Sequence, residues 1–213
     1  MSEQPGGIQE YAAVRVRTGN FTRAFDIFCA VTGLLLLSPA LLVIAAAIRL
    51  DDRGPVFYRQ VRVGRDFHPF RVWKFRSMIT NADQHGLLTA PRDSRLTRVG
   101  RILRQYKLDE LPQLFNVLKG EMQLVGARPE VERYVRVFPS QYAVILQERP
   151  GITDPATLAY RREEQIFLPG KMDEQYVTQI LPDKLKLSLA YQEQRTPLSD
   201  IRILLRTVFG VIS

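Results

Sequence analysis

LLLLSPALLVI, residues 34–44, lies at the middle of the only long apolar run in this chain of 213 residues. The run extends from Ile27 to Ile48 and contains no charged side chain. As one straight helix it would be about 33 Å long, enough to cross a hydrocarbon core of about 30 Å. Pro39 lacks a backbone N–H and its ring clashes with the carbonyl of residue 35, so a helix must kink or break at Ser38 and Pro39.

The basic residues around this run distinguish two arrangements in a membrane. A kinked helix that spans the bilayer would leave one basic flank outside the cell, against the preference of Lys and Arg for the cytoplasmic side. A re-entrant helix-break-helix over residues 21–50, with the membrane break at Ser38 and Pro39, keeps both flanks on one side. The charge pattern favours re-entry, and a spanning helix stays the alternative. The flanking residues are Arg15, Arg17 and Arg23 before the run and Arg49, Arg53, Arg59 and Arg62 after it.

A cleaved secretory signal does not fit the same segment. The sequence Ala45-Ala-Ala47 resembles a cleavage site, but the apolar run is longer than the usual core of about 7–15 residues. Cys29 is the only cysteine, so no disulfide framework indicates an oxidising compartment. Residues 1–20 contain Gly6-Gly7 and no hydrophobic periodicity, which predicts a flexible leader before the membrane helix.

The net charge of +8 is concentrated in one part of the chain. Between Arg49 and Lys107 there are fourteen Lys and Arg residues against five acidic ones, which predicts an anionic partner. Nucleic acid, anionic lipid and a phosphorylated small substrate all carry the right charge. The chain has no zinc-finger spacing and no helix-turn-helix signature, so we expect no nucleic acid. Membrane lipid and a phosphorylated substrate remain, and they are compatible with each other.

Periodicity predicts a β-hairpin followed by helices. Residues 56–63 and 70–75 are rich in valine and aromatic residues, and Lys74 and Arg76 alternate with Trp73 and Phe75. We therefore expect one apolar and one cationic face on the hairpin. Apolar residues then recur at helical spacing from residue 94 to 107, and again from 111 to a stop at Gly120. A further helical stretch covers about 134–147, and Pro150-Gly151 predicts a turn.

The C-terminal run from Ile201 to Ile212 is apolar, with Arg202 and Arg206 on one side. It suits a helix in the membrane interface or, equally well, a packed core helix. The overall pattern indicates an α+β, mainly helical protein. It would consist of a single membrane-associated domain, with a flexible leader (1–20), a re-entrant membrane helix (21–50) and a membrane-surface domain (51–213) that contains the hairpin and amphipathic interfacial helices.

The segment from Lys107 to Leu114, KLDELPQL, is the strongest candidate for chemistry. Asp109 occupies a position suited to an N-cap, and a helix N-terminus would keep Asp109 and Glu110 anionic near pH 7. Capping is one interpretation of the pair. The other depends on Arg104 and Arg128, since arginines bind phosphate oxygens and an ionised carboxylate can attack phosphorus as a covalent nucleophile. A divalent cation or the arginines would then have to neutralise the phosphate.

Other catalytic constellations are weak. His68 and His85 are the only histidines, and each lies beside a Pro or Gly in a predicted loop. There is no Ser/His/Asp ordering and no Cys/His metal spacing.

The motifs between about residues 20 and 155 resemble those of the bacterial sugar transferase family, the small monotopic polyprenyl-phosphate phosphoglycosyl transferases. The block Leu108–Gly120 is the most specific of them. The matching pieces are Arg23-Ala-Phe-Asp26, Ser38-Pro39, Gly54-Pro-Val-Phe-Tyr-Arg-Gln60, Lys74-Phe-Arg-Ser-Met78, Arg98-Val-Gly-Arg-Ile-Leu-Arg104, Lys107–Gly120 and Gly126-Ala-Arg-Pro129.

This resemblance implies an enzyme on the cytoplasmic face of the bacterial inner membrane. It implies transfer of a sugar-1-phosphate from a UDP-sugar to polyprenyl (undecaprenyl) phosphate with Mg²⁺, the first membrane step of glycoconjugate or exopolysaccharide assembly. Asp109 would be the nucleophile that forms a phosphosugar intermediate and releases UMP, and also a candidate metal ligand. Glu110 would be its acidic partner. Arg104 and Arg128 would bind phosphate, with Lys74 and Arg76 as weaker candidates.

Two departures from the family pattern limit what the resemblance implies. The family commonly has proline where Ala127 stands, and the segment from Asp154 to Tyr160 differs from the usual one. The resemblance therefore implies no particular sugar, and the sequence indicates no oligomeric state. The competing interpretation is a non-catalytic adaptor that docks on anionic lipid, which would explain the basic residues and the apolar run but not the Asp109-Glu110 pair.

Overall fold

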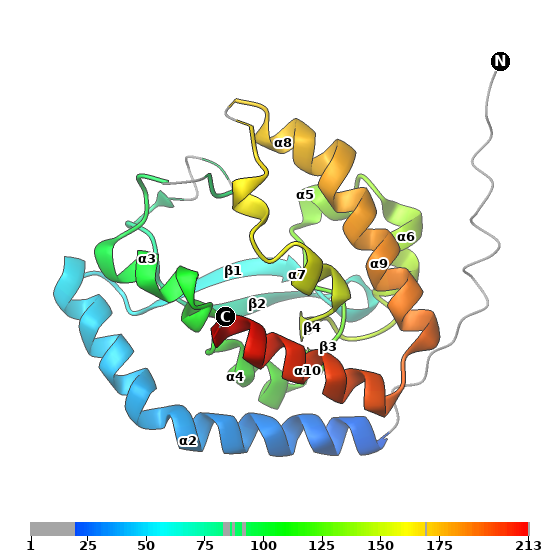
Figure 1. The fold of residues 1–213 in the computed structure, drawn as a ribbon, viewed down its shortest axis with the longest axis horizontal. Helices are drawn as coiled ribbons and strands as arrows, with labels where there is room; N and C mark the ends of the chain where they lie inside the picture. The colour runs from blue at the N-terminus through cyan, green and yellow to red at the C-terminus, as the bar shows by residue number, and fades with distance from the viewer. Residues whose placement is uncertain (1–19, 83–85, 87, 91–92, 169, 213) are drawn as a thin grey trace.

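The computed structural model of the chain describes residues 20–82, 86, 88–90, 93–168 and 170–212. The predicted leader, except for Asn20, lies outside these residues. His85, which was predicted to lie in a loop, also lies outside them. The described part is mainly helical with a short two-stranded hairpin, which confirms the predicted class (Figure 1).

Helix α2, Asn20–Asp52, contains the whole apolar run and passes through Pro39 without interruption. Figure 1 shows a clear bend along it, so the predicted break is a bend in one continuous helix. The Ser38 hydroxyl donates to the Leu35 carbonyl at 2.8 Å, the carbonyl that the nitrogen of Pro39 cannot bond. In the described part of the chain, this is the one helix long and apolar enough to cross a membrane.

The predicted hairpin is confirmed as β1, Phe57–Val63, and β2, Pro69–Phe75, paired antiparallel with Phe57 opposite Phe75. A short 3-10 turn, η1 (Arg65–Phe67), joins them. The expected cationic face is wrong, because Lys74 and Arg76 are largely buried in ion pairs with Glu110 and Asp52. Sequence alternation places side chains on a face but does not show what covers that face.

Helices α3, Arg98–Gln105, and α4, Gln113–Lys119, correspond to the two predicted amphipathic segments. Gly120 ends α4 in the left-handed conformation at φ 81°, as predicted. Asn116, fully buried, holds α4 to the hairpin. Its Oδ1 accepts from the Trp73 N–H at 2.9 Å, and its Nδ2 donates to the Arg71 carbonyl at 2.8 Å.

We expect Asn116→Ala to lower the free energy of unfolding by roughly 1–3 kcal/mol, because two backbone groups of β2 lose their partner in a buried position. Denaturant unfolding of the purified protein in detergent measures this change. Gln105→Ala, on the exposed surface of α3, is the control and should change stability little. A loss as small as that of the control would show that α4 docks without this side chain.

Two three-residue strands, β3 (Gln123–Val125) and β4 (Gly151–Thr153), form a buried parallel pair that the sequence analysis missed. The predicted turn at Pro150-Gly151 is wrong, since Gly151 opens β4. A Cβ on Gly151 would lie 2.1 Å from the Gly126 nitrogen, so only glycine permits this approach. The single helix expected around 134–147 is two, α5 (Glu132–Val135) and α6 (Pro139–Ile145), because Pro139 starts a new helix.

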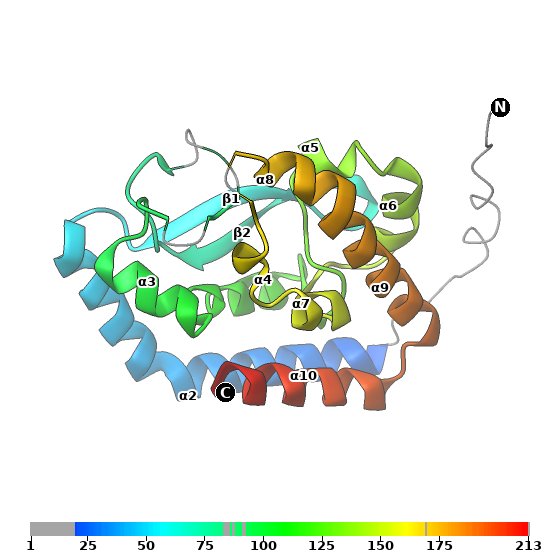
Figure 2. The same ribbon diagram turned by 45° about the horizontal axis from the view of Figure 1, so that its top comes forward.

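The C-terminal half adds four further helices and two irregular turns. Helix α10 packs against the parallel strands and α7, whereas α9 packs against α6 and α7. In both views α10 runs along the part of α2 that precedes the bend (Figures 1 and 2). The bounds are α7 (Pro155–Ala159), η4 (Glu163–Gln165), α8 (Met172–Gln175), the π-turn η5 (Tyr176–Ile180), α9 (Leu181–Gln194) and α10 (Pro197–Ile212).

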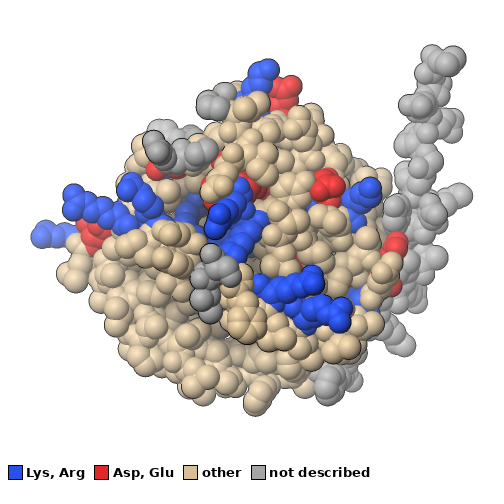
Figure 3. Space-filling model, viewed as in Figure 1, with Lys and Arg blue, Asp and Glu red and all other residues tan. Residues whose placement is uncertain are grey.

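Helices α2 and α10 leave large apolar side chains exposed. Leu36 of α2 is 76% exposed and Phe209 of α10 is 64% exposed, whereas Ile203 of α10 is buried in the core. Figure 3 shows the lower edge of the molecule, formed by α2, without charged side chains in that view. An apolar surface of this kind on an otherwise charged protein is typical of a membrane or partner contact.

Candidate functional site

The chain turns sharply between α3 and α4 through a single 3-10 turn, η3 (Leu108–Glu110). Lys107 precedes it in the left-handed conformation at φ 52°, which is uncommon for a residue other than glycine. Asp109 and Glu110 both lie in this turn, and neither caps a helix: Lys107 is the N-cap of η3 and Pro112 is the N-cap of α4. The capping interpretation of Asp109 is therefore wrong.

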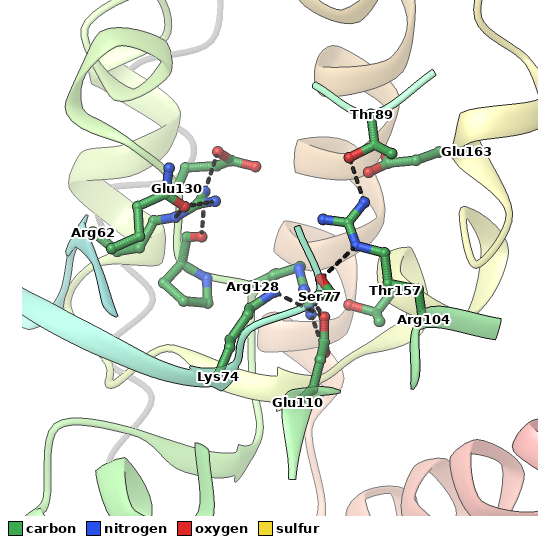
Figure 4. Close-up of polar contacts among 12 residues, drawn as sticks. Arg62, Lys74, Ser77, Thr89, Arg104, Glu110, Arg128, Glu130, Thr157 and Glu163 are labelled. Atoms are coloured by element: carbon green, nitrogen blue, oxygen red, sulfur yellow. Dashed lines mark hydrogen bonds and ion pairs between the residues drawn. The ribbon is translucent and has the colours of Figure 1, made fainter. Parts of the chain in front are cut away.

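Glu110 is held by two cations from distant segments (Figure 4). Lys74 of β2 lies 3.0 Å from Glu110 Oε1, and Arg128 binds both oxygens, with its Nη1 2.9 Å from Oε2. Burial alone would raise the pKa of Glu110, but the charges of Arg128 and Lys74 hold that pKa well below its usual range. Glu110 is thus anionic at neutral pH, as the sequence predicted.

Asp109 differs from its neighbour. Its residue is 4% exposed, and burial together with the charge of Glu110 raises the pKa of Asp109. The predicted helix N-terminus does not stabilise the charged form of this carboxylate, because Asp109 lies in the single 3-10 turn η3, which has no long helix dipole behind it. Its Oδ1 has no hydrogen-bond partner among the described residues. A buried acceptor left without a donor is costly, so this oxygen is a candidate for contact with a ligand.

Arg104 approaches the same turn from α3. Gly100 allows α3 to pack directly on Ser77, since a Cβ there would lie 1.9 Å from the Ser77 carbonyl oxygen. The Arg104 guanidinium donates to Ser77 Oγ at 3.2 Å and to the Thr89 hydroxyl, and within the described residues it has no carboxylate partner. It faces Thr89 rather than Glu110 in Figure 4. Arg104 therefore brings a positive charge that no acidic side chain neutralises.

Arg76, predicted as a weaker phosphate contact, has a different position. Its side chain is 5% exposed and its guanidinium binds both oxygens of Asp52 at the end of α2. This geometry favours a structural role for Arg76, as a link between the end of β2 and helix α2. The structure thus brings Lys74, Arg104, Asp109, Glu110 and Arg128 together and leaves Arg76 outside the group.

A cavity of about 590 Å³ opens beside this group. Lys107, Glu110 and Arg128 line one end, and aliphatic side chains from α2, α4 and α10 line another part. Sequence reasoning missed this cavity because its walls come from segments far apart in the sequence, from Leu37 to Val208. It also missed Glu130, which binds Arg62 at 2.9 Å and lines the cavity near Arg128. The adjacency of Glu130 to the Arg128-Pro129 motif was the available signal.

The described residues thus combine an unpaired buried carboxylate oxygen, a fixed glutamate and several cations beside a cavity. Figure 3 shows Lys and Arg side chains gathered over the middle of this face. A model of the family described as bacterial sugar transferase matches residues 17–213. The chain belongs to the bacterial sugar transferase family.

Three named proteins are similar in sequence to this chain. An Aeromonas hydrophila UDP-N-acetylgalactosamine-undecaprenyl-phosphate N-acetylgalactosaminephosphotransferase is 44% identical over 142 residues, covering 65% of this chain and 34% of that protein. A Klebsiella pneumoniae UDP-glucose:undecaprenyl-phosphate glucose-1-phosphate transferase is 39% identical over 194 residues, covering 89% of this chain and 39% of that protein. The exopolysaccharide production protein ExoY of Rhizobium meliloti (strain 1021) is 35% identical over 185 residues, with 79% and 82% covered.

The chain spans little more than a third of the length of the first two relatives and most of the third. The bacterial sugar transferase match covers α2, the hairpin, the η3 turn and α10 alike. The family membership therefore applies to the whole described fold.

Proposed function

We propose that the chain is a phosphoglycosyl transferase that moves a sugar-1-phosphate from a UDP-sugar to polyprenyl (undecaprenyl) phosphate. This would be the first membrane step of glycoconjugate or exopolysaccharide assembly. The observation that carries the proposal is the buried, unpaired Oδ1 of Asp109, close to the positive charges of Lys74, Arg104 and Lys107. The names of the relatives, which pair UDP-sugars with undecaprenyl phosphate, support the substrate class.

In the proposed first step, an oxygen of the Asp109 carboxylate attacks the phosphorus that bears the sugar. A bond forms between that oxygen and phosphorus, and the phosphorus–oxygen bond to UMP breaks, with its electron pair leaving on UMP. In the second step an oxygen of polyprenyl phosphate attacks the same phosphorus and Asp109 leaves. Arg104 is placed to bind phosphate oxygens, because no carboxylate within the described residues occupies it.

Glu110 has a different role in this proposal. Because Lys74 and Arg128 are both bound to it, Glu110 fixes two positive charges beside the reacting phosphate. Fixed charges stabilise charge that develops on phosphate oxygens without reorganising during the reaction. Glu110 is thus a positioning residue for the two cations.

The donor set fits Mg²⁺ to a limited extent. Lys74 and Arg128 occupy both oxygens of Glu110, and the described residues contain no group of three His, Cys, Asp or Glu that could hold a metal. Mg²⁺ in phosphoryl-transfer sites often binds through one or two carboxylates and the substrate phosphates. We propose that Asp109 would hold it together with the donor diphosphate, whose charge the ion would neutralise.

We further propose that the protein is monotopic on the cytoplasmic face of the bacterial inner membrane. The exposed apolar side chains of α2 and α10 would contact lipid, with α2 re-entering at the Ser38-Pro39 bend. The basic residues at both ends of α2, Arg23 and Arg49, support this topology over a spanning helix.

Cysteine labelling tests the topology. Single cysteines at Ala24 and at Arg53, in a protein whose native Cys29 is replaced by serine, should both be shielded from an impermeant thiol reagent in intact cells. Both should react after permeabilisation, which is the control for accessibility. Labelling of one position and not the other in intact cells would show a spanning helix.

UMP release tests the proposed activity. The protein is incubated with Mg²⁺, undecaprenyl phosphate and a panel of UDP-sugars, and we expect UMP from at least one of them. Release of UMP from none would favour the alternative, a non-catalytic adaptor that binds anionic lipid. The adaptor would give no reason for the unpaired Asp109 oxygen.

A further inference from the structure

The cavity beside Asp109 has two chemically different parts. Lys107, Glu110 and Arg128 give one part charged walls, whereas Leu37 of α2, Leu114 of α4 and Leu204 of α10 give the other part aliphatic walls. The volume of about 590 Å³ is in the range of roughly 300–1,000 Å³ that holds a small organic ligand. One ligand with a charged head and an apolar body would match both parts.

The hydroxyl groups in the apolar walls are hydrogen-bonded within the protein. The hydroxyls of Thr153 and Thr207 bond each other at 2.8 Å, and Thr207 also donates to the Ile203 carbonyl. Deeper in the cavity, Asp154 accepts from Ser188 and from Thr157. These hydroxyls and Asp154 are therefore already paired, so a sugar or a nucleotide placed against them would bury polar groups without partners.

The apolar part reaches the surface that the membrane helices expose. Leu37 is 37% exposed and Val208 of α10 is 58% exposed, and both line the cavity. A hydrocarbon chain that lies between α2 and α10 could thus pass from the cavity into lipid without crossing water, which the hydrophobic effect favours. The bend at Ser38-Pro39 directly follows Leu37, so it sets where α2 contributes to this wall.

We propose that this apolar part binds the first units of the isoprenoid chain of the lipid acceptor, with the acceptor phosphate directed toward Arg128 and Lys107. The inference rests on the proposed function, since it assigns a site to one of its two substrates. It makes Leu37 and Leu204 residues of the acceptor site.

Two pairs of adjacent leucines allow a matched test. Leu204 lines the cavity, and Leu205 does not and is 52% exposed. Leu37 lines it, and Leu36 does not and is 76% exposed. We expect Leu204→Trp and Leu37→Trp to fill the site and raise the KM for undecaprenyl phosphate by at least about tenfold. Leu205→Trp and Leu36→Trp, the controls, should leave this KM within about twofold, because aromatic side chains are tolerated at membrane surfaces.

The first half-reaction separates the possible results. UMP release in the absence of acceptor should continue in Leu204→Trp and Leu37→Trp, which also shows that they are folded. An unchanged KM in both variants would overturn the proposal. Loss of UMP release in a variant with a normal unfolding temperature would also overturn it, because the cavity would then hold the donor.

Cross-linking tests binding without turnover. Undecaprenyl phosphate with a photoreactive group near its phosphate end should label peptides that contain Leu37 or Leu204 in the wild-type protein. Label confined to other peptides would overturn the proposed site. A wild-type protein that binds and labels in this way but releases no UMP would instead refute the proposed function, so the two failures are distinguishable.

Discussion

Replacing Asp109 by asparagine is expected to abolish the release of UMP that precedes addition of the acceptor, with a loss of at least about 10³-fold. An amide is a poor nucleophile, so no bond to phosphorus forms. Because Asp109 caps no helix and asparagine has nearly the same size, the fold should survive. Label from a radioactive sugar phosphate should remain on the wild-type protein and be absent from the variant.

Asp66→Asn is the matched control for this experiment. Asp66 is exposed in the η1 turn at φ 54°, a conformation that asparagine also adopts readily, and it lies outside the site. It should retain full UMP release. An active Asp109→Asn protein, with deamidation excluded by mass spectrometry, would end the covalent proposal.

The pKa of Asp109 gives the same experiment a pH dependence. Burial and the Glu110 charge raise this pKa, and only the ionised carboxylate attacks phosphorus. As the pH falls through the raised value, the ionised fraction decreases, so UMP release should decline at a higher pH than for an ordinary aspartate, whose pKa is near 3.8. The pH profile of the UMP burst measures this decline.

Glu110→Gln is expected to lower the free energy of unfolding by roughly 2–4 kcal/mol, because Lys74 and Arg128 lose the negative charge that pairs with both of them. The cost is below that of a fully buried pair, since the Arg128 side chain is 32% exposed. Turnover should fall as well, because the two cations are no longer held in place. Denaturant unfolding and steady-state assays measure the two effects.

The stability loss should itself depend on pH. The pKa of Glu110 is lowered by folding, so its contribution is present above the unfolded value near 4.5 and disappears as the pH falls through the lower folded value. The gap between wild type and Glu110→Gln should therefore be widest near neutral pH and narrow on acidification. The control Glu132→Gln breaks an exposed pair with Arg136 and should cost no more than about 0.5 kcal/mol. Equal losses in the two variants would refute the structural role of Glu110.

Elements with a local signal could be predicted from the sequence. Alternating valine and aromatic residues placed the hairpin within one residue of β1 and β2 at all four ends, and helical spacing with Gly120 placed α3 and α4. Strands β3 and β4 are three residues long and buried on all sides, so they have no alternation to detect. Their pairing depends on contact between Gly126 and Gly151, which are far apart in the sequence.

The candidate residues of the site could be named from the sequence, but their contacts could not. Asp109, Glu110, Arg104 and Arg128 could be identified from one motif and its basic neighbours. Their ionisation depends on partners and burial: Glu110 meets Lys74 from 36 positions earlier, whereas Asp109 meets no donor in the described residues. Arg76 looked equivalent to Lys74 by alternation, yet it binds Asp52 because β2 ends beside α2.

The hydrogen bond from Ser38 to the Leu35 carbonyl makes the bend in α2 a reporter of its surroundings. In water, a carbonyl that loses this donor is hydrated at little cost. In hydrocarbon the same carbonyl has no substitute, and leaving it bare costs several kcal/mol. The free-energy cost of removing the Ser38 hydroxyl therefore depends on whether water or hydrocarbon surrounds the middle of α2. A small cost would indicate water around the bend, and a cost of several kcal/mol would indicate hydrocarbon.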